Sequence, residues 1–514
     1  MGGEDESSAL GRITQARKDE EWDQVLALLR DHWSELVQDD PHALLDIIGS
    51  LSAPVLEQNP RLRLADQHLR RTLRRDPEPR AYRDILTDDP DAAPLDRLAA
   101  LTGRIAAARA AGRHRDAVDA TDRAVAALRE LPVEVIPSFG NALPEFHYHW
   151  GVTYLLVSRF ADAMEQFTRS HDWAVTVDNR MVSTRAGGAI ALVHALHGRG
   201  RDAKTWLSKL PSVPDEAWWA ADARTAATIA EAIVLIEQLQ LDAARSLLAG
   251  IQIASSPDLL GPYFAVRAFI IDDDRAEAQS LLSEFDSFVE GLAPEYAEVP
   301  LNAEYSALVR YLLLQVLHQP ERAVRALGPT KVGVEASVVQ QVGVTLHALR
   351  MVKLGQVTAA RKIVAPLLHV SSARPRVLLP ALVIAAASDA VDQQQELLRR
   401  AVGLASWNGC YAALAFAPVE QRVALAELLR ECEGDEIADR LLAIEESTAI
   451  AGSDTLTRRE AAVVEAALSG LSNVEISELQ HVSVNTVKTH IRIAYRKLGV
   501  SNRTQLLQLY QLGR

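Results

Sequence analysis

The feature that most restricts the fold of this chain is a turn followed by alanine, with a larger apolar residue four positions later, which recurs along most of its length. Examples are "RDAVDAT", "ADAMEQF", "LDAARSLL" and "ERAVRAL". Apolar residues are spaced as on one face of a helix, and short clusters rich in Pro, Gly or Asp interrupt them. Because strand-like alternation is scarce, the pattern predicts an all-helical body of short helices joined by tight turns.

The spacing of these alanines indicates a repeat of helix pairs. In the clearest copy, "HYHWGVTYLLVSRFADAMEQF", Gly151, Tyr154 and Phe167 lie where a tetratricopeptide repeat has its small and aromatic residues, and the segment resembles that repeat. We therefore expect a tetratricopeptide-like superhelical array. The alternative is an irregular bundle of Ala-rich amphipathic helices. The alanines expected at the same buried position are Ala117, Ala163, Ala203, Ala243, Ala278, Ala323 and Ala359.

Length and charge divide the chain into two parts. A chain of 514 residues exceeds what one hydrophobic core normally serves. Residues 451–514 hold eight Lys or Arg and five Asp or Glu, a net charge of +3, so the first 450 residues carry −17 of the total of −14. The small, polar stretch "EESTAIAGSD" suits a linker. We expect a helical body over residues 1–446, a linker over 447–455 and a basic domain over 456–514.

Capping residues predict four helices in the basic domain. Thr457 with Glu460 and Ser472 with Glu475 both have the spacing of a capping box. Gly470 is expected to end the first helix and Gly499 the third. The third helix begins after Ser483, and Asn502 with Gln505 opens the fourth.

The second and third helices are separated only by "QHVS", which is typical of a helix-turn-helix. On the third helix, Val487, Ile491, Ala494 and Leu498 form a core stripe. The opposite face is polar and cationic, and such side chains suit base edges and phosphates of duplex DNA. The candidate DNA-binding residues are Asn485, Thr486, Lys488, Thr489, Arg492 and Arg496.

The domain closely resembles the LuxR-type DNA-binding domain, through "LTRRE", "GLSNVEI", "TVKTH" and "YRKLGV". The resemblance implies that Lys488, Thr489 and Arg492 contact the groove and that Thr486 lies near the DNA backbone. It also implies pairing of two chains on DNA through the last helix. The candidate residues for this dimer contact are Leu506, Leu509 and Tyr510.

The body resembles the helical sensor region of the large ATP-binding LuxR regulators. It has no G-x-x-x-x-G-K-[ST] motif and no Gly-Lys dipeptide, so we expect no nucleotide or other cofactor. In "EFHYHW", His147 and His149 do not share a helix face, which speaks against a metal site. No catalytic constellation stands out, so we expect no enzyme.

The cellular compartment is inferred from the secretion and membrane signals that the sequence lacks. Two cysteines without C-x-x-C spacing, an acidic N-terminus and apolar runs far below the ~20 residues of a membrane span indicate a cytoplasmic protein that does not enter a membrane.

Two functions remain. The first is a transcription regulator whose body senses a protein partner or small ligand and whose C-terminal domain binds promoter DNA as a dimer. The second is a helical-repeat scaffold for proteins, with a weakly DNA-competent C-terminal domain.

Overall fold

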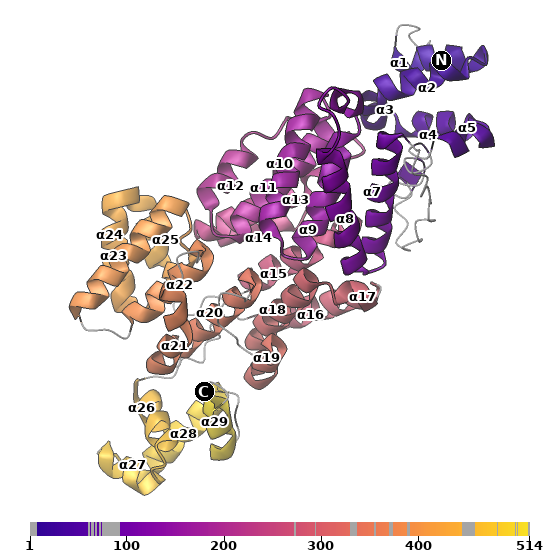
Figure 1. The fold of residues 1–514 in the computed structure, drawn as a ribbon. Helices are drawn as coiled ribbons and strands as arrows, with labels where there is room; N and C mark the ends of the chain where they lie inside the picture. Colours follow the sequence, from indigo (N-terminus) through magenta and orange to yellow (C-terminus); the bar gives the residue numbers. More distant parts are fainter. Residues whose placement is uncertain are drawn as a thin grey trace.

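The computed structural model describes residues 8–59, 62, 66, 69–70, 73, 93–271, 274–292, 294–328, 337–353, 356–369, 374–387, 391–444, 458–480, 482–498, 500 and 502–511. Within these ranges the chain forms α-helices and short 3-10 helices, and it contains no strand (Figure 1). The all-helical prediction is confirmed. The expected linker, residues 447–455, lies outside the described residues.

Five short helices form the N-terminal unit, and their core also takes in buried residues of later helices. They are α1 (Ala9–Lys18), α2 (Trp22–Asp31), α3 (Trp33–Asp39), α4 (Pro41–Ser50) and α5 (Ala53–Gln58). Ser8 caps α1 through Gly11 N–H, and Asp40 caps α4 through Ala43 N–H. The fully buried side chains include Ile13, Val25, Leu29, Leu44 and Ile48.

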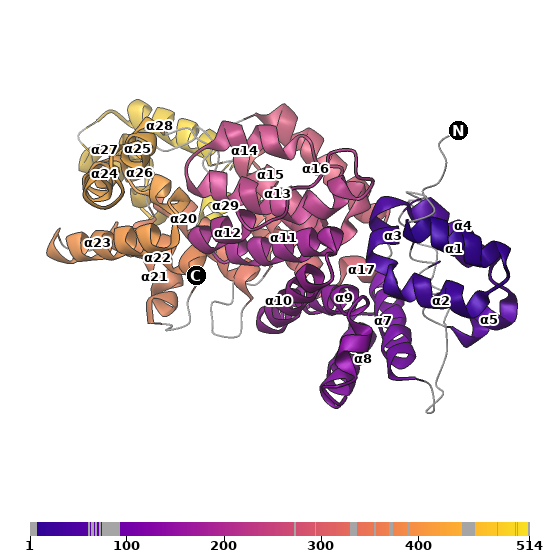
Figure 2. The same cartoon turned by 90° about the horizontal axis from the view of Figure 1, so that it is seen from above.

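The remaining helices of the body follow one another as an array, with the N-terminal unit at one end and α23 to α25 at the other (Figure 2). They are α7 (Pro94–Ala110), α8 (His114–Arg129), α9 (Leu143–Leu156), α10 (Phe160–Thr176), α11 (Arg180–Leu196), α12 (Gly200–Leu207), α13 (Ala220–Glu237), α14 (Leu241–Leu248), α15 (Leu260–Ile270), α16 (Arg275–Glu290), α17 (Pro294–Ala297), α18 (Pro300–Val316), α19 (Pro320–Leu327), α20 (Val338–Lys353), α21 (Val357–Val364), α22 (Pro375–Ala386), α23 (Val391–Asn408), α24 (Val419–Glu433) and α25 (Asp435–Ala443). The 3-10 helices are η1 (Ile136–Phe139), η2 (Ile253–Ser255), η3 (Pro257–Leu259), η4 (Ala365–His369) and η5 (Ala412–Phe416).

Neighbouring helices pack in pairs, and the pairs stack through their first members. Helix α9 packs on α10, α11 on α12, α13 on α14, α18 on α19 and α20 on α21. The first helices also pack on one another in the order α7, α9, α11, α13, α15, α18, α20 and α22. Each pair therefore buries its apolar face against the next, as in helical-repeat arrays. One hydrophobic core runs through this stack from α9 to α25.

The recurring alanine is buried at one fixed helical position. In seven pairs the fourth residue of the second helix is an alanine with at most 1% exposure. The sequence prediction was wrong by one residue for Ala243, which is exposed, and for Ala359, which is half-buried. The distance from the turn decides which residue faces the first helix, and α14 and α21 begin one residue later than the pattern suggested. The buried alanines are Ala117, Ala163, Ala203, Ala244, Ala278, Ala323 and Ala360.

The turns within and between pairs share one conformation. The second residue after the helix is left-handed, with φ between 50° and 77°, and the next N–H donates to the carbonyl five residues back. Arg159 N–H, for example, donates to Tyr154 O at 2.9 Å. This is the Schellman arrangement, which satisfies carbonyls at a helix end. The left-handed residues are Gly112, Ser158, Asp178, Gly198, Leu239 and His318.

No helix in the described part of the chain is both long and apolar enough to cross a bilayer.

Candidate nucleic-acid interface

The C-terminal domain is a small helical unit with its own core. Its helices are α26 (Arg458–Leu468), α27 (Asn473–Leu479), α28 (Val484–Lys497) and α29 (Arg503–Gln511). Helix α28 packs on α26 and on α27, and α26 also contacts α29. The buried residues are Val463, Val464, Ala466, Ala467, Ile476, Val487, Ala494, Leu498, Val500 and Leu506.

Helix α27 begins where the sequence predicts. The Ser472 side chain accepts from Glu475 N–H at 3.3 Å, and the Glu475 carboxylate accepts from Ser472 N–H at 2.6 Å. These two bonds form the expected capping box. They hold the pKa of Glu475 below its usual value, first through the Ser472 backbone N–H. Gly470, which follows α26, has φ +94°, so it supplies the left-handed residue that ends that helix.

Two further predicted caps are present. Ser483 Oγ accepts from Thr486 N–H at 3.1 Å at the start of α28, and Asn502 Oδ1 accepts from Gln505 N–H at 2.9 Å at the start of α29. Both caps fix where their helix begins, and hence which residues face outward. The predicted roles of Thr457 and Gly499 fall on residues outside the described ones.

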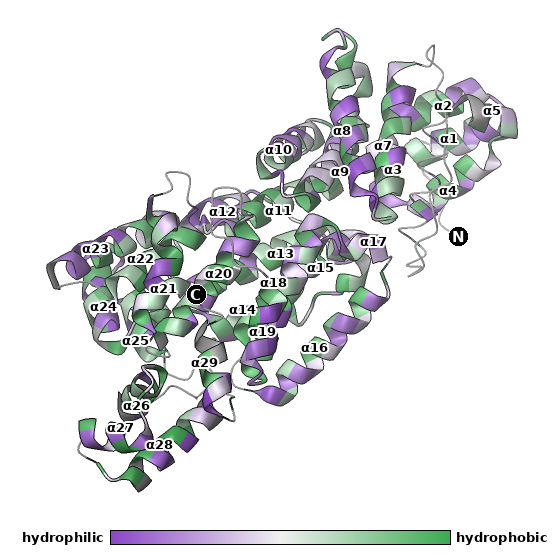
Figure 3. Cartoon of the chain, turned by 60° about the horizontal axis from the view of Figure 1, so that its bottom comes forward, coloured by the Kyte–Doolittle hydropathy of each residue, from purple (hydrophilic) through white to green (hydrophobic). Residues whose placement is uncertain are grey.

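Helix α28 has one apolar and one polar face. Val487 and Ala494 are fully buried, Leu498 is nearly so, and Ile491 packs against the same core while half-buried. The predicted core stripe is confirmed. Figure 3 shows hydrophobic and hydrophilic residues on different sides of α28.

The predicted outward set lies on the other face. Lys488, Thr489 and Arg492 are exposed. Thr486 is half-buried, and its hydroxyl lies 2.8 Å from Ser483 Oγ, so it is held at the helix start. Asn485 and Arg496 belong to α28 and fall on the same face by helical position. Their side chains lie outside the described part.

The candidate pairing residues all belong to α29. Leu506 is fully buried in the core of its own domain, so its side chain faces inward in the single chain. The side chains of Leu509 and Tyr510 are not among those described.

The histidines of "EFHYHW" have separate environments in the body. His147 is buried, and its Nδ1 lies 2.7 Å from Gln166 Oε1. His149 instead shares a face of α9 with Glu145, with Nε2 4.0 Å from Glu145 Oε2. In the described part of the chain, no three His, Cys, Asp or Glu side chains are grouped as a metal site would require.

The tryptophan pair at residues 218 and 219 lies in the turn that precedes α13, not on a helix. Trp219 is buried in the core of the N-terminal unit. Trp218 is half-buried, and its Nε1 donates to Val37 O at 3.1 Å. Two adjacent residues of a helix could not both face one core. The turn removes that restriction, and both rings pack against the same unit.

The capped α27, the short turn, and α28 with its buried and exposed faces define a helix-turn-helix DNA-binding domain. Residues 454–510 match the model of the family described as "Bacterial regulatory proteins, luxR family". The C-terminal domain is therefore a LuxR-family helix-turn-helix domain, as the sequence resemblance predicted.

Curated proteins match a short part of the chain. The HTH-type transcriptional regulator MalT of Yersinia pestis (strain Pestoides F) is 40% identical over 78 residues, which is 15% of this chain and 9% of that protein. The regulator of the same name from Yersinia enterocolitica serotype O:8 / biotype 1B has the same identity and coverage. The chain thus matches about a tenth of the length of these relatives. No solved structure matches the chain.

Proposed function

We propose that this chain is a sequence-specific transcription regulator that places α28 in the major groove of promoter DNA. The observation that carries the proposal is the geometry of α28: Val487 and Ala494 fix the helix to the domain core, and Lys488, Thr489 and Arg492 are exposed on the other side. A rigid helix with outward Lys, Thr and Arg side chains has the form of a recognition helix. The relatives named above are called transcriptional regulators, which supports the proposal.

Each outward residue has a proposed partner on DNA. Lys488 and Arg492 donate to guanine O6 and N7 or to phosphate oxygens. The Thr489 methyl group packs on thymine, and Asn485 pairs with adenine. Thr486 and Arg496 bind the sugar-phosphate backbone and fix the register of the helix.

We further propose that two chains pair on DNA through α29. Leu506 is committed to the core of its own domain, so the contact falls to Leu509 and Tyr510, with Leu506 supporting the helix from behind. A two-fold pair of this kind reads two half-sites about one helical turn, ~34–36 Å, apart. The body is proposed to sense the signal.

The test is genome-wide DNA capture with the full-length chain at near-physiological salt, where phosphate attraction alone is weakened. We expect discrete enriched sites for the wild type and none for Lys488→Ala, Arg492→Ala. The control is Arg129→Ala, Arg180→Ala, which removes the same charge from side chains of the body that are 63% and 56% exposed. It should enrich the wild-type sites. Equal enrichment by both double variants, or none by the wild type, would favour the scaffold.

A further inference from the structure

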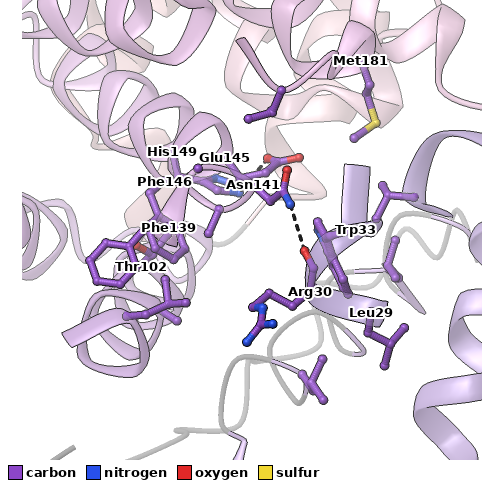
Figure 4. A pocket seen from close by; sticks show the side chains of 18 of the residues that line it. Leu29, Arg30, Trp33, Thr102, Phe139, Asn141, Glu145, Phe146, His149 and Met181 are labelled. Atoms are coloured by element: carbon purple, nitrogen blue, oxygen red, sulfur yellow. Dashed lines mark hydrogen bonds and ion pairs between the residues drawn. The ribbon is translucent and has the colours of Figure 1, made fainter. Parts of the chain in front are cut away.

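A cavity of about 510 Å³ lies where the N-terminal unit meets the array. Helices α2 and α3 form one wall, and α7, η1, α9 and α11 form the other (Figure 4). Its size is in the range of sites that enclose a small organic molecule. Nothing in the DNA-binding proposal uses it.

Most of the lining is apolar. Trp33, Phe139, Phe146 and Trp218 contribute aromatic surface, and Leu, Val, Ala and Met side chains fill the space between them. Water in such a space finds few hydrogen-bond partners, so an apolar molecule that displaces it gains contacts. The walls favour an apolar, ring-containing body.

One carboxylate interrupts the apolar lining. Glu145, on α9, lines the cavity, and its Oε2 is enclosed without a hydrogen-bond partner. His149 Nε2 lies 4.0 Å from this oxygen, beyond hydrogen-bond distance. Burial raises the pKa of Glu145, and the Arg185 charge opposes that rise. A buried carboxylate with an unsatisfied oxygen is costly unless a donor is supplied.

The other charges of the lining are already matched. Arg185 is 9% exposed and lies 2.6 Å from Asp222, while Arg30 lies 3.1 Å from its neighbour Asp31. An anionic ligand would have to displace one of these carboxylates. A cationic donor would meet a Glu145 oxygen that has no hydrogen-bond partner, and charge-assisted bonds of this kind are the stronger ones.

We propose that this cavity binds a small amphiphilic cation, a molecule with an apolar ring body and one protonated amine that donates to the Glu145 carboxylate. The aromatic walls hold the body, and the carboxylate selects the charge. The role of this ligand as the regulator's signal rests on the proposed function. Its binding to the cavity does not depend on that function.

The cavity also lies at the interface between the N-terminal unit and the array. Around it, Asn141 Nδ2 donates to Arg30 O at 2.9 Å and Trp218 Nε1 to Val37 O at 3.1 Å, from the array to the N-terminal unit. A ligand that contacts both walls adds contacts across this interface. Binding should therefore slow amide hydrogen exchange in α2 and α3.

The test uses three probes with one apolar body: 1-pyrenemethylamine, 1-pyrenemethanol and 1-pyrenecarboxylate. Pyrene fluorescence is titrated with full-length protein in the absence of DNA. We expect the amine to bind saturably at one site, at least about tenfold more tightly than the alcohol, with the acid weakest. Without DNA in the assay, a failure here and a failure of DNA capture are separate results.

Glu145→Gln should lower the affinity for the amine to that for the alcohol. The control Glu165→Gln changes a carboxylate of α10 that is 39% exposed, and it should keep the preference. Ala99→Phe, which fills the cavity from α7, should weaken all three probes. The proposal is overturned if the amine shows no saturable binding, if the acid binds best, or if the preference for the amine survives Glu145→Gln.

Discussion

Gly151 lies directly against the ring of Phe167, so close that a Cβ on residue 151 would be 2.6 Å from two ring carbons. Gly151 is on α9 and Phe167 on α10, and Phe167 is fully buried. The contact shows why the repeat requires a small residue opposite an aromatic one: the two helices of the pair could not otherwise approach so closely.

Gly151→Ala is therefore expected to destabilise the body by about 1–3 kcal/mol, the usual cost of overpacking a tight core. The measurement is urea unfolding. Gly403→Ala is the matched control, because Gly403 lies within α23 and a Cβ there meets nothing within 4 Å. Helix propensity alone should make that variant more stable by about 0.5–1 kcal/mol. Equal effects of the two substitutions would contradict the packing argument.

Ser158 tests the turns of the array. It has φ +62°, and its hydroxyl is enclosed without a hydrogen-bond partner. Ser158→Gly removes both costs and is expected to raise the stability by about 1 kcal/mol, whereas Ser158→Val should lower it because a β-branched residue resists this conformation. Thermal unfolding of both variants checks the sign. A loss of stability in the glycine variant would argue against strain at this turn.

These turns also show what the sequence could and could not predict about the fold. Helix periodicity and turn clusters predicted the helical array, because both are local signals. The residue at which each helix begins was harder to predict. Only Gly112 and Gly198 mark the left-handed position of the turn with a glycine. At Ser158, Asp178, Leu239 and His318 the tertiary structure imposes that conformation on residues that do not prefer it. At α14, which follows Leu239, the predicted alanine was one residue out.

His147 makes the stability of the body depend on pH. Burial lowers the pKa of His147 to about 4, from an ordinary value of 6.5. The unfolded chain then binds a proton more readily than the folded one between these values, so stability should fall as pH drops from about 7 towards 4, by roughly 3 kcal/mol at most for this group.

His147→Gln should flatten this slope, because glutamine cannot titrate and still offers a donor to Gln166. The measurement is the free energy of unfolding at a series of pH values. His42→Gln, at an exposed histidine of α4, serves as the control and should keep the wild-type slope. An unchanged slope in His147→Gln would show that the residue is not the source.

The capping box gives a prediction for the DNA-binding domain. Ser472→Ala should destabilise α27 by about 1 kcal/mol and speed its amide hydrogen exchange. The pKa of Glu475 is held below 4.5 by the Ser472 N–H, so the contribution of that carboxylate is complete above this pH and is lost as pH falls through the lower folded value. Glu475→Gln should retain the bond but lose the pH dependence. If neither substitution changes the amide exchange rates in α27, the capping box does not stabilise this helix.

The candidate DNA-binding surface was largely predictable, and the cavity was not. Ser483, Val487 and Ala494 lie within one helix, so caps and periodicity sufficed to place Lys488 and Arg492 outward. Glu145, Trp33 and Trp218 come together from distant segments. Only the packing of the N-terminal unit on the array brings them to one site, and no local pattern carries that information.

Whether α28 reads bases is tested by selection of binding sites from randomised duplex DNA by the wild type and by Thr489→Ala. Thr489 is exposed and uncharged, so its loss leaves the attraction to phosphates unchanged. We predict that the wild type selects a two-fold site and that Thr489→Ala loses the preference at one or two positions of each half-site, with the others retained. Selection of the same sequence with the same strength by both proteins, or of no sequence by the wild type, would show that α28 does not read bases through Thr489.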